Sequence, residues 1–210
     1  MSALKDQITL LKSFLRGRFK ITVLCCSIAF LLIWIAGYFI GINSPEVVEE
    51  VMSSFFTNAQ EQGALKNDGS IAFFPLLANN WRVMMLSVLQ GAIPFLFLPA
   101  VTLASNAYLI GLAGARFTLK GIPFHLFLAS ILPHGIFELP AIVLSIACGI
   151  HLCISLAKLI TRSFKRTPMG ETLSDLLRVM LLLVAPMTIL AAVIETYITE
   201  WFVYFIVMIS

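Results

Sequence analysis

The stretch ITVLCCSIAFLLIWIAGYFIGI, residues 21–42, decides the fold class of this chain. It contains no charged side chain, and about 20 apolar residues in a helix are enough to cross the hydrocarbon core of a bilayer. The run is about twice as long as the apolar part of a secretory signal peptide, and no small-residue cleavage site follows it. We therefore expect residues 21–42 to remain as the first membrane-spanning helix.

The composition of the whole chain agrees with this. Of its 210 residues, 60% are hydrophobic and only 12% are charged, with a mean hydropathy of +0.97. A soluble domain is about 45–50% apolar and about one quarter charged, so this chain lacks the polar side chains to cover itself in water. The sequence predicts one all-α membrane domain over residues 1–210. We expect a polytopic bundle of about five spans, with one short re-entrant or surface helix and one outer amphipathic helix.

The charges are distributed unevenly along the chain. Residues 1–20 carry five basic side chains and one acid, whereas residues 43–80 carry five acids and one lysine. Basic flanks stay in the cytoplasm, which predicts a multi-pass protein of the cytoplasmic membrane with its N-terminus inside and residues 43–80 outside. The basic N-terminus suits anionic lipid headgroups, and no interleaving of basic and aromatic residues suggests nucleic acid as a partner.

Periodicity and breaker residues divide the rest of the chain. Residues 1–20 have the apolar spacing of a cytoplasmic amphipathic helix, and 43–80 form an acidic outer loop with a short helix from Ser44-Pro45 to about Gly63. Gly91, Pro94 and Pro99 split the next apolar run in two. The remaining predicted elements are spans at 81–98 and 100–117, a re-entrant or surface helix at 123–132 broken at Pro133, spans at 134–160 and 173–195 with a kink at Pro186, and an interfacial anchor at 201–209.

No familiar catalytic motif occurs in the sequence. Cys25, Cys26, Cys148 and Cys153 lie in apolar runs without a CxxC pair, which is typical of packing residues. There is no GxSxG, no phosphate-binding loop and no strand pattern to carry a dinucleotide fingerprint. We expect no cofactor, and the sequence gives no reason to predict an enzyme.

A few ionisable side chains interrupt the apolar spans, and such groups are functional candidates by default. His134 and Glu138 are four residues apart and so share one helix face. In the predicted topology Glu195 and Asn80 lie at the same depth of the outer leaflet. The sequence therefore predicts an intramembrane polar cluster of Asn80, His134, Glu138 and Glu195, with Glu138 and Glu195 close enough to interact directly or through His134, Asn80 or water.

Four interpretations of this cluster stay open. It could be a structural network that locks the helices together, which is the interpretation we favour from the sequence. It could relay protons or ions in a transporter. His134, Glu138 and Glu195 could hold a metal ion, although their spacing matches no specific metal motif. Finally, the cluster could line a pocket for a substrate or a partner.

Small residues predict where helices pack. Gly37-xxx-Gly41 and the series Ala107, Gly111, Ala115 are small-xxx-small patterns that allow close approach, within the fold or between copies in a homo-oligomer. Gln90 and Asn106 are expected to form hydrogen bonds across helices or, alternatively, to line a transport pathway. His151 lies about 100° around the helix from His134 and cannot share its site, and His125 precedes the predicted break at Pro133. Both are expected to be ordinary packing residues.

Four blocks of the sequence resemble, in the correct order, the stage II sporulation protein M family. They are Asn79-Asn80-Trp81-Arg82 followed by Gly91, then Ser105-Asn106-Ala107-Tyr108-Leu109-Ile110-Gly111, then Leu132-Pro133-His134-Gly135-Ile136-Phe137-Glu138-Leu139-Pro140-Ala141 with Gly149, and finally Ala191–Thr199. The resemblance covers about residues 75–200, and residues 81–200 would form the family-like core. Asn106-Ala107 departs from the usual Asn-Gly of the family.

The resemblance implies a function more weakly than a fold. Sporulation members of this family work in a membrane complex with peptidoglycan-degrading enzymes, and many relatives occur in organisms that do not sporulate. It implies a non-enzymatic scaffold or assembly subunit for envelope remodelling, with membrane lipids and other membrane or envelope proteins as partners. Two rival predictions are a small permease or export component with a polar intramembrane site and a metal-dependent membrane enzyme.

Overall fold

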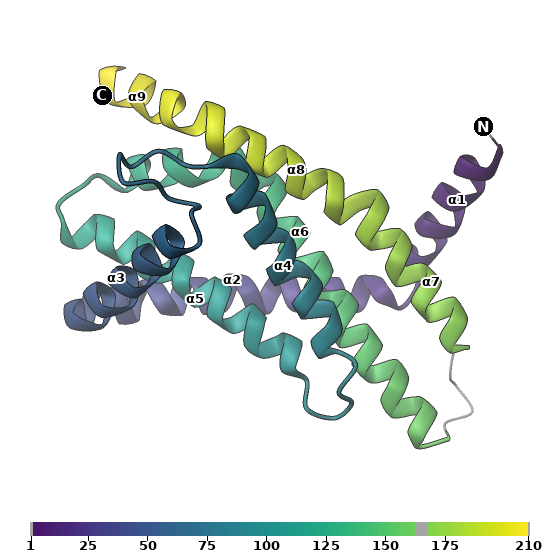
Figure 1. The fold of residues 1–210 in the computed structure, drawn as a ribbon. Helices are drawn as coiled ribbons and strands as arrows, with labels where there is room; N and C mark the ends of the chain where they lie inside the picture. The colour runs from purple at the N-terminus through teal and green to yellow at the C-terminus, as the bar shows by residue number, and fades with distance from the viewer. Residues whose placement is uncertain (1, 163–167, 210) are drawn as a thin grey trace.

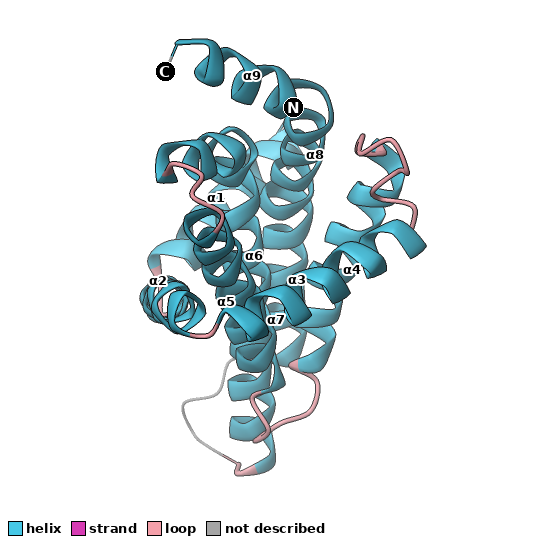
Figure 2. Ribbon diagram, turned by 90° about the vertical axis from the view of Figure 1, so that its left-hand side faces the viewer, coloured by secondary structure: helices cyan, strands magenta, loops and turns pink. Residues whose placement is uncertain are grey.

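The computed structural model describes residues 2–162 and 168–209, and within these ranges every regular element is a helix (Figure 2). The single β feature there is an isolated bridge between Leu65 and Ile71. This confirms the all-α fold class. The elements are α1 (Ser2–Arg16), α2 (Phe19–Asn43), α3 (Pro45–Glu61), α4 (Phe73–Gln90), α5 (Leu98–Leu119), α6 (Phe124–Ile160), α7 (Met169–Val179), the π-helix η1 (Met180–Val184), α8 (Ala185–Ile194), the π-helix η2 (Glu195–Thr199) and α9 (Glu200–Ile209).

Four helical stretches among the described residues are long and apolar enough to cross a membrane: Phe19–Asn43, Leu98–Leu119, Phe124–Ile160 and Met169–Met208. Helix α4 is not among them, since its 18 residues include Asn79, Asn80 and Arg82. The helical membrane bundle is thus confirmed, whereas the total of five spans stays a prediction that depends on α4.

The predicted break at Pro133 is wrong. Residues 124–160 form one 37-residue helix, α6, with both Pro133 and Pro140 inside it. A proline removes one backbone hydrogen bond, but membrane helices tolerate this when neighbouring helices support the flanking turns. The predicted short helix at 123–132 is therefore the first part of α6, and His134 lies within a continuous helix.

The predicted separation of residues 173–195 from a terminal anchor at 201–209 is also wrong. The chain runs as one helical rod from Met169 to Met208, which includes two π-helical turns. The first, η1, ends two residues before Pro186, and its wider turn accommodates a residue that has no N–H. The second, η2, begins at Glu195, so the second irregularity falls on a residue of the predicted polar cluster.

The boundary of α4 differs from the predicted span 81–98. The helix starts at Phe73 and ends at Gln90, so the loop predicted over 43–80 ends at residue 72. Residues 91–97 form the turn to α5, in which Phe95 and Phe97 adopt positive φ values of 71° and 48°. The predicted helix within the loop is present as α3, which begins at Pro45 and ends two residues before Gly63.

The small residues predicted for close packing bring α2 and α5 together. A Cβ atom on Gly111 would lie 2.5 Å from the carbonyl oxygen of Trp34, and one on Gly41 would lie 2.6 Å from the Cβ of Ala115. Gly37 faces Tyr108 in the same way. These contacts lie within one chain, so the two patterns serve the fold of the monomer.

The short helices α1 and α3 lie at opposite ends of the bundle, and side-chain contacts hold each of them there. The Arg178 side chain of α7 donates to Gln7 of α1 over 2.6 Å, and Phe14 of α1 stacks on Phe19 at the start of α2. At the other end, Arg116 near the end of α5 pairs with Glu49 of α3 at 3.3 Å. We call these the α1 end and the α3 end. Figure 1 shows α3 and the C-terminus far from α1 and the start of α7.

Candidate functional site

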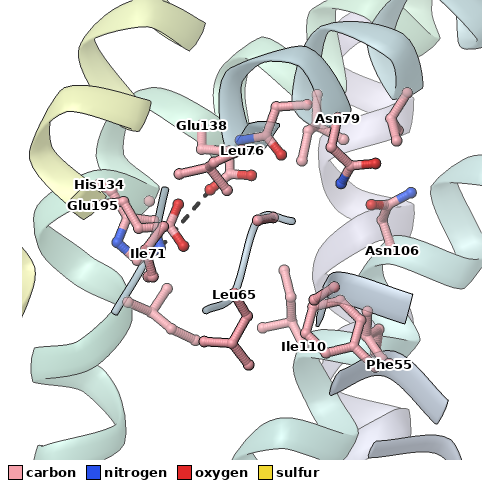
Figure 3. Close-up of a pocket in the computed structure, with 18 of the residues that line it drawn as sticks. Phe55, Leu65, Ile71, Leu76, Asn79, Asn106, Ile110, His134, Glu138 and Glu195 are labelled. Carbon is pink, nitrogen blue, oxygen red and sulfur yellow. Dashed lines mark ion pairs between the residues drawn. The ribbon is translucent and has the colours of Figure 1, made fainter. Parts of the chain in front are cut away.

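The long helix α6 and the π-turn η2 supply the centre of the candidate site. His134 and Glu138 are one turn apart on α6 and present the same face to η2, which carries Glu195 and Thr199. Figure 3 shows His134, Glu138 and Glu195 pointing toward one another. Single π-turns within long helices occur often at functional sites, because they shift side chains out of the regular helical register.

The three ionisable side chains lie close together. His134 Nε2 is 3.8 Å from Glu138 Oε2, and one ligand atom from each of His134, Glu138 and Glu195 lies within 4.8 Å of the other two. The side chains of His134 and Glu138 are only 12% and 19% exposed. We refer to these three residues as the His-Glu-Glu cluster. The proximity that the spacing argument predicted for these three residues is thus present across two helices.

Thr199 orients the imidazole of the cluster. Its hydroxyl oxygen lies 3.2 Å from the backbone carbonyl of Ile194 and 3.3 Å from Nδ1 of His134. A hydroxyl has one proton, and donation of that proton to the carbonyl leaves the oxygen to accept from Nδ1–H. This network assigns the proton of a neutral imidazole to Nδ1, so the lone pair on Nε2 faces the two carboxylates.

Among the described residues, the two carboxylates have no partner that would stabilise their charge. Within residues 2–162 and 168–209, neither Glu138 nor Glu195 receives a hydrogen bond, and the 3.8 Å contact with His134 exceeds hydrogen-bonding distance. A buried carboxylate is costly unless it is paired, neutralised or bound to a cation. The described geometry is therefore not the fully satisfied network that the structural interpretation of the cluster requires.

The cluster forms one end of a cavity of about 410 Å³. Residues from α3, the segment 62–72, α4, α5, α6 and η2 line it, and none of these lining residues is a lysine or an arginine. The segment 62–72 passes across the cavity through Leu65 and Ile71, as Figure 3 shows. This segment is held by a backbone bond from Ala72 N to the carbonyl of Ala64 and by the Leu65–Ile71 bridge.

Three asparagines also line the cavity: Asn79, Asn80 and Asn106. Figure 3 shows Asn79 and Asn106 on the side of the cavity opposite His134 and Glu195. Asn80 is only 9% exposed, and its Nδ2 has no hydrogen-bond partner among the described residues. Asn106 donates from Nδ2 to the carbonyl of Thr102 within α5, so its described hydrogen bond does not cross helices as predicted, and its oxygen is left to accept. The cavity thus combines an acidic end with amide groups.

A second hollow, of about 530 Å³, reaches the cluster from the side of α9. His134 and Glu195 line both hollows, together with Ile71 of the segment 62–72. Ser130, Thr199 and Tyr204 are among the other residues that line the second one. His134 and Glu195 therefore border two spaces, whereas Glu138 lines only the first.

The other polar residues singled out from the sequence lie outside the cavity. Gln90 accepts a 2.7 Å hydrogen bond from Thr102, which links α4 to α5 as the packing interpretation predicts. His151 packs edge-on against Phe14 and Phe19, and His125 is exposed. The four cysteines are free thiols, and Cys25 is the exposed one among them.

Sequence reasoning missed the roles of Thr199 and of the segment 62–72. Thr199 follows Glu195 by four residues, a spacing that indicates a shared helix face and could have suggested a link to His134. The segment 62–72 carries a turn signal at Asn67-Asp68-Gly69. Nothing in its sequence, however, indicates that Leu65 and Ile71 cover a cavity formed by distant helices.

The fold and the site define a class: a polytopic helical membrane protein with a His-Glu-Glu cluster inside its bundle. Residues 24–200 match the sequence model of the stage II sporulation protein M family, and the chain belongs to this family. It is also 27% identical over 180 residues to an uncharacterized protein of Methanocaldococcus jannaschii, a match that covers 86% of this chain and 94% of the relative. No solved structure matches the chain.

Proposed function

We propose that this protein is a small permease or export component that binds a polar or cationic solute inside its bundle. The observation that carries the proposal is the cavity of about 410 Å³ lined by Asn106, Glu138 and Glu195. A purely structural polar cluster would be dry and fully paired, whereas here Asn80 Nδ2 has no described partner. Buried polar groups without a protein partner typically form hydrogen bonds with a ligand or with water.

The position of the cluster supports solute passage as well as solute binding. His134 and Glu195 line both hollows, so a solute bound at the cluster could be reached from either one. Transporters typically place such polar sites within the membrane, next to irregular helical turns, and open them to one side at a time. In this protein η2 supplies the irregular turn and carries Glu195.

We infer the cytoplasmic membrane as the location, with the α1 end inside and the α3 end outside. The basic residues of α1 and the acidic residues of α3 and its following segment support this orientation. In this orientation the cavity lies under segment 62–72 on the outer side. A solute from outside would enter past Leu65 and Ile71.

The second candidate function is a scaffold or assembly subunit in envelope remodelling. The family resemblance supports it, together with the exposed acids Glu46, Glu50, Glu61 and Asp68 on α3 and the segment that follows. An acidic, exposed surface suits a basic partner protein outside the membrane. This function needs no solute in the cavity, which is the basis of the test.

Cysteine accessibility distinguishes the two functions. Asn106→Cys is introduced into a chain whose four native cysteines are replaced by alanine, and sealed vesicles of each orientation are treated with a membrane-impermeant cationic thiosulfonate. A solute pathway predicts modification of Asn106→Cys. Ser105→Cys, on the exposed lipid-facing side of the same helix, is the control and should stay unmodified. Protection of Asn106→Cys from both faces would contradict a solute pathway and favour the scaffold.

A further inference from the structure

We propose that the His-Glu-Glu cluster binds one divalent transition-metal ion of the zinc class, through His134 Nε2 and one oxygen each from Glu138 and Glu195. This inference deepens the proposed function, because it names a ligand of the same cavity. It rests on geometry, on charge balance and on the hydrogen bond that orients the imidazole.

The geometry fits a small cation with limited side-chain movement. One ligand atom from each of the three side chains lies within 4.8 Å of the other two, and His134 Nε2 is 3.8 Å from Glu138 Oε2. In a tetrahedral site with metal–ligand distances of about 2.0–2.2 Å, neighbouring ligand atoms are about 3.3–3.6 Å apart. Rotation about the terminal bonds of Glu138 and Glu195 covers the difference, so no backbone movement is needed.

The charges fit a divalent ion. Two carboxylates and a neutral imidazole carry a formal charge of −2, and the described residues that line the cavity include no lysine or arginine to balance it. Two close carboxylates in a place shielded from water repel each other unless a cation or a proton intervenes. One divalent ion neutralises both and also supplies the partner that neither has among the described residues.

The hydrogen bond from His134 to Thr199 has the form found around metal-binding histidines. A ligating histidine almost always donates its other ring N–H to an oxygen, which fixes the tautomer and the ring orientation. Here Nδ1 faces Thr199 Oγ1 at 3.3 Å, and Nε2 is left facing the carboxylates. Imidazole with carboxylates suits zinc and its neighbours, whereas Mg²⁺ and Ca²⁺ prefer oxygen ligands alone.

The site would keep an open position toward the cavity. Three protein ligands leave the fourth tetrahedral position for water or a solute, as in zinc sites that act on substrates. Asn80 lines the same cavity, is 9% exposed and has an Nδ2 donor without a described partner. This donor is suited to a hydrogen-bond acceptor carried by a ligand in that space.

Direct binding of Zn²⁺ tests the proposal. The purified full-length protein in detergent is stripped with a chelator and dialysed against Zn²⁺, and the bound metal is measured by mass spectrometry. We expect one Zn²⁺ per chain, retained in excess Mg²⁺. Glu138→Gln, Glu195→Gln and His134→Ala should each lower the affinity at least tenfold. Glu46→Gln and His125→Ala, which change exposed residues of the same types, are the matched controls and should bind like the parent.

Thr199→Val gives an independent measure that does not remove a metal ligand. Loss of the oxygen that orients a ligating histidine typically weakens metal binding about 10–100-fold. Thr196→Val is its control, because Thr196 belongs to the same π-turn and its hydroxyl has no described partner. Equal Zn²⁺ affinity in the parent, Glu138→Gln and Thr199→Val proteins would overturn the metal site, and so would the absence of Zn²⁺ binding to the folded parent.

The proposals of a metal site and of a solute pathway can be refuted independently of each other. Modification of Asn106→Cys without Zn²⁺ binding would refute the metal site and leave the pathway intact. Zn²⁺ binding by a protein whose Asn106→Cys stays protected from both faces would support the metal site and refute the pathway. Asn106 is a suitable reporter, because it lines the cavity on the side opposite His134 and Glu195 (Figure 3).

Discussion

Gly91 and Gly149 are in direct backbone contact: a Cβ atom on Gly91 would overlap the carbonyl oxygen of Gly149. A Cβ atom on Gly149 would in turn overlap the backbone of Ser87 and would lie 2.8 Å from Pro99. The end of α4 and the middle of α6 therefore touch without any intervening side chain. Small residues permit such contacts between helices in membranes.

Gly149→Ala should destabilise the protein, because the added methyl group forces α4 away from α6. We expect a loss of about 1–3 kcal/mol, the usual cost of overpacking, seen as a lower midpoint of thermal unfolding in detergent. Gly170→Ala is the matched control, since nothing lies within 4 Å of that position. Equal unfolding midpoints for the two variants would argue against the contact.

Gly111→Leu tests the packing of α2 against α5. A side chain at this position meets the backbone of Trp34, Gly37 and Tyr38, so we expect a loss of about 1–3 kcal/mol. Ser105→Leu adds a side chain of the same size on the exposed side of α5 and should be nearly neutral. Thermal unfolding of both variants checks this, and unchanged stability of Gly111→Leu would contradict the close helix contact.

The topology prediction assigns Lys5 to the cytoplasm and both Asp68 and Lys120 to the outside. Lys165 is also predicted to be cytoplasmic but lies outside the described residues. Single cysteines at these positions, in the chain without native cysteines, should react with impermeant reagents from those sides only. Labelling of a cysteine at residue 120 from the cytoplasmic side alone would mean that α4 and α5 do not both cross the membrane.

The turn in segment 62–72 should loosen in acid. The backbone N–H and the hydroxyl of Ser70 donate to Asp68 Oδ1 at 2.9 and 2.7 Å, and these bonds lower the pKa of the Asp68 carboxyl. A lowered pKa in the folded state means that the stabilisation is present above the ordinary aspartate value of about 3.9. It is lost as the pH falls through the lowered pKa.

Hydrogen exchange at the amide of Ser70, expressed as a protection factor, measures this effect. Asp68→Ala should lose the protection at every pH. Asp68→Asn keeps an acceptor oxygen and should retain protection without the dependence on pH. Glu61→Gln, a change of an exposed acid near the same segment, is the control. Protection in the parent protein that persists unchanged in acid would refute the role of Asp68.

Residues 21–42 indicated the fold class from sequence alone. A helix with such a long apolar run is unstable in water, and this holds independently of the rest of the chain. The helical spacing of His134 and Glu138, with the depth of Glu195, was likewise sufficient to predict that these side chains meet. Helical periodicity and membrane thickness are local constraints, and the sequence encodes both directly.

Tertiary structure decided whether prolines and π-turns broke the helices. Pro133 was expected to end a helix, but α6 continues through it. Membrane helices tolerate a proline where neighbouring helices support the flanking turns. A proline removes the same backbone hydrogen bond whether the helix ends there or continues. The sequence of α6 alone therefore could not distinguish a broken helix from a continuous one. The register shift at η2, which presents Glu195 and Thr199 to His134, likewise depends on packing against another helix.

Tertiary structure also decided that the polar cluster borders a cavity. Its volume depends on how α3, segment 62–72, α4, α5 and α6 pack together, and no short stretch of sequence encodes that arrangement. Asn106 and Gln90 are both amide side chains within apolar stretches, so the sequence does not distinguish them. In the structure, however, Asn106 lines the cavity and Gln90 accepts a hydrogen bond from Thr102. The sequence determined which polar groups lie in the apolar helices. Packing between distant segments determined which of these groups have no partner among the described residues.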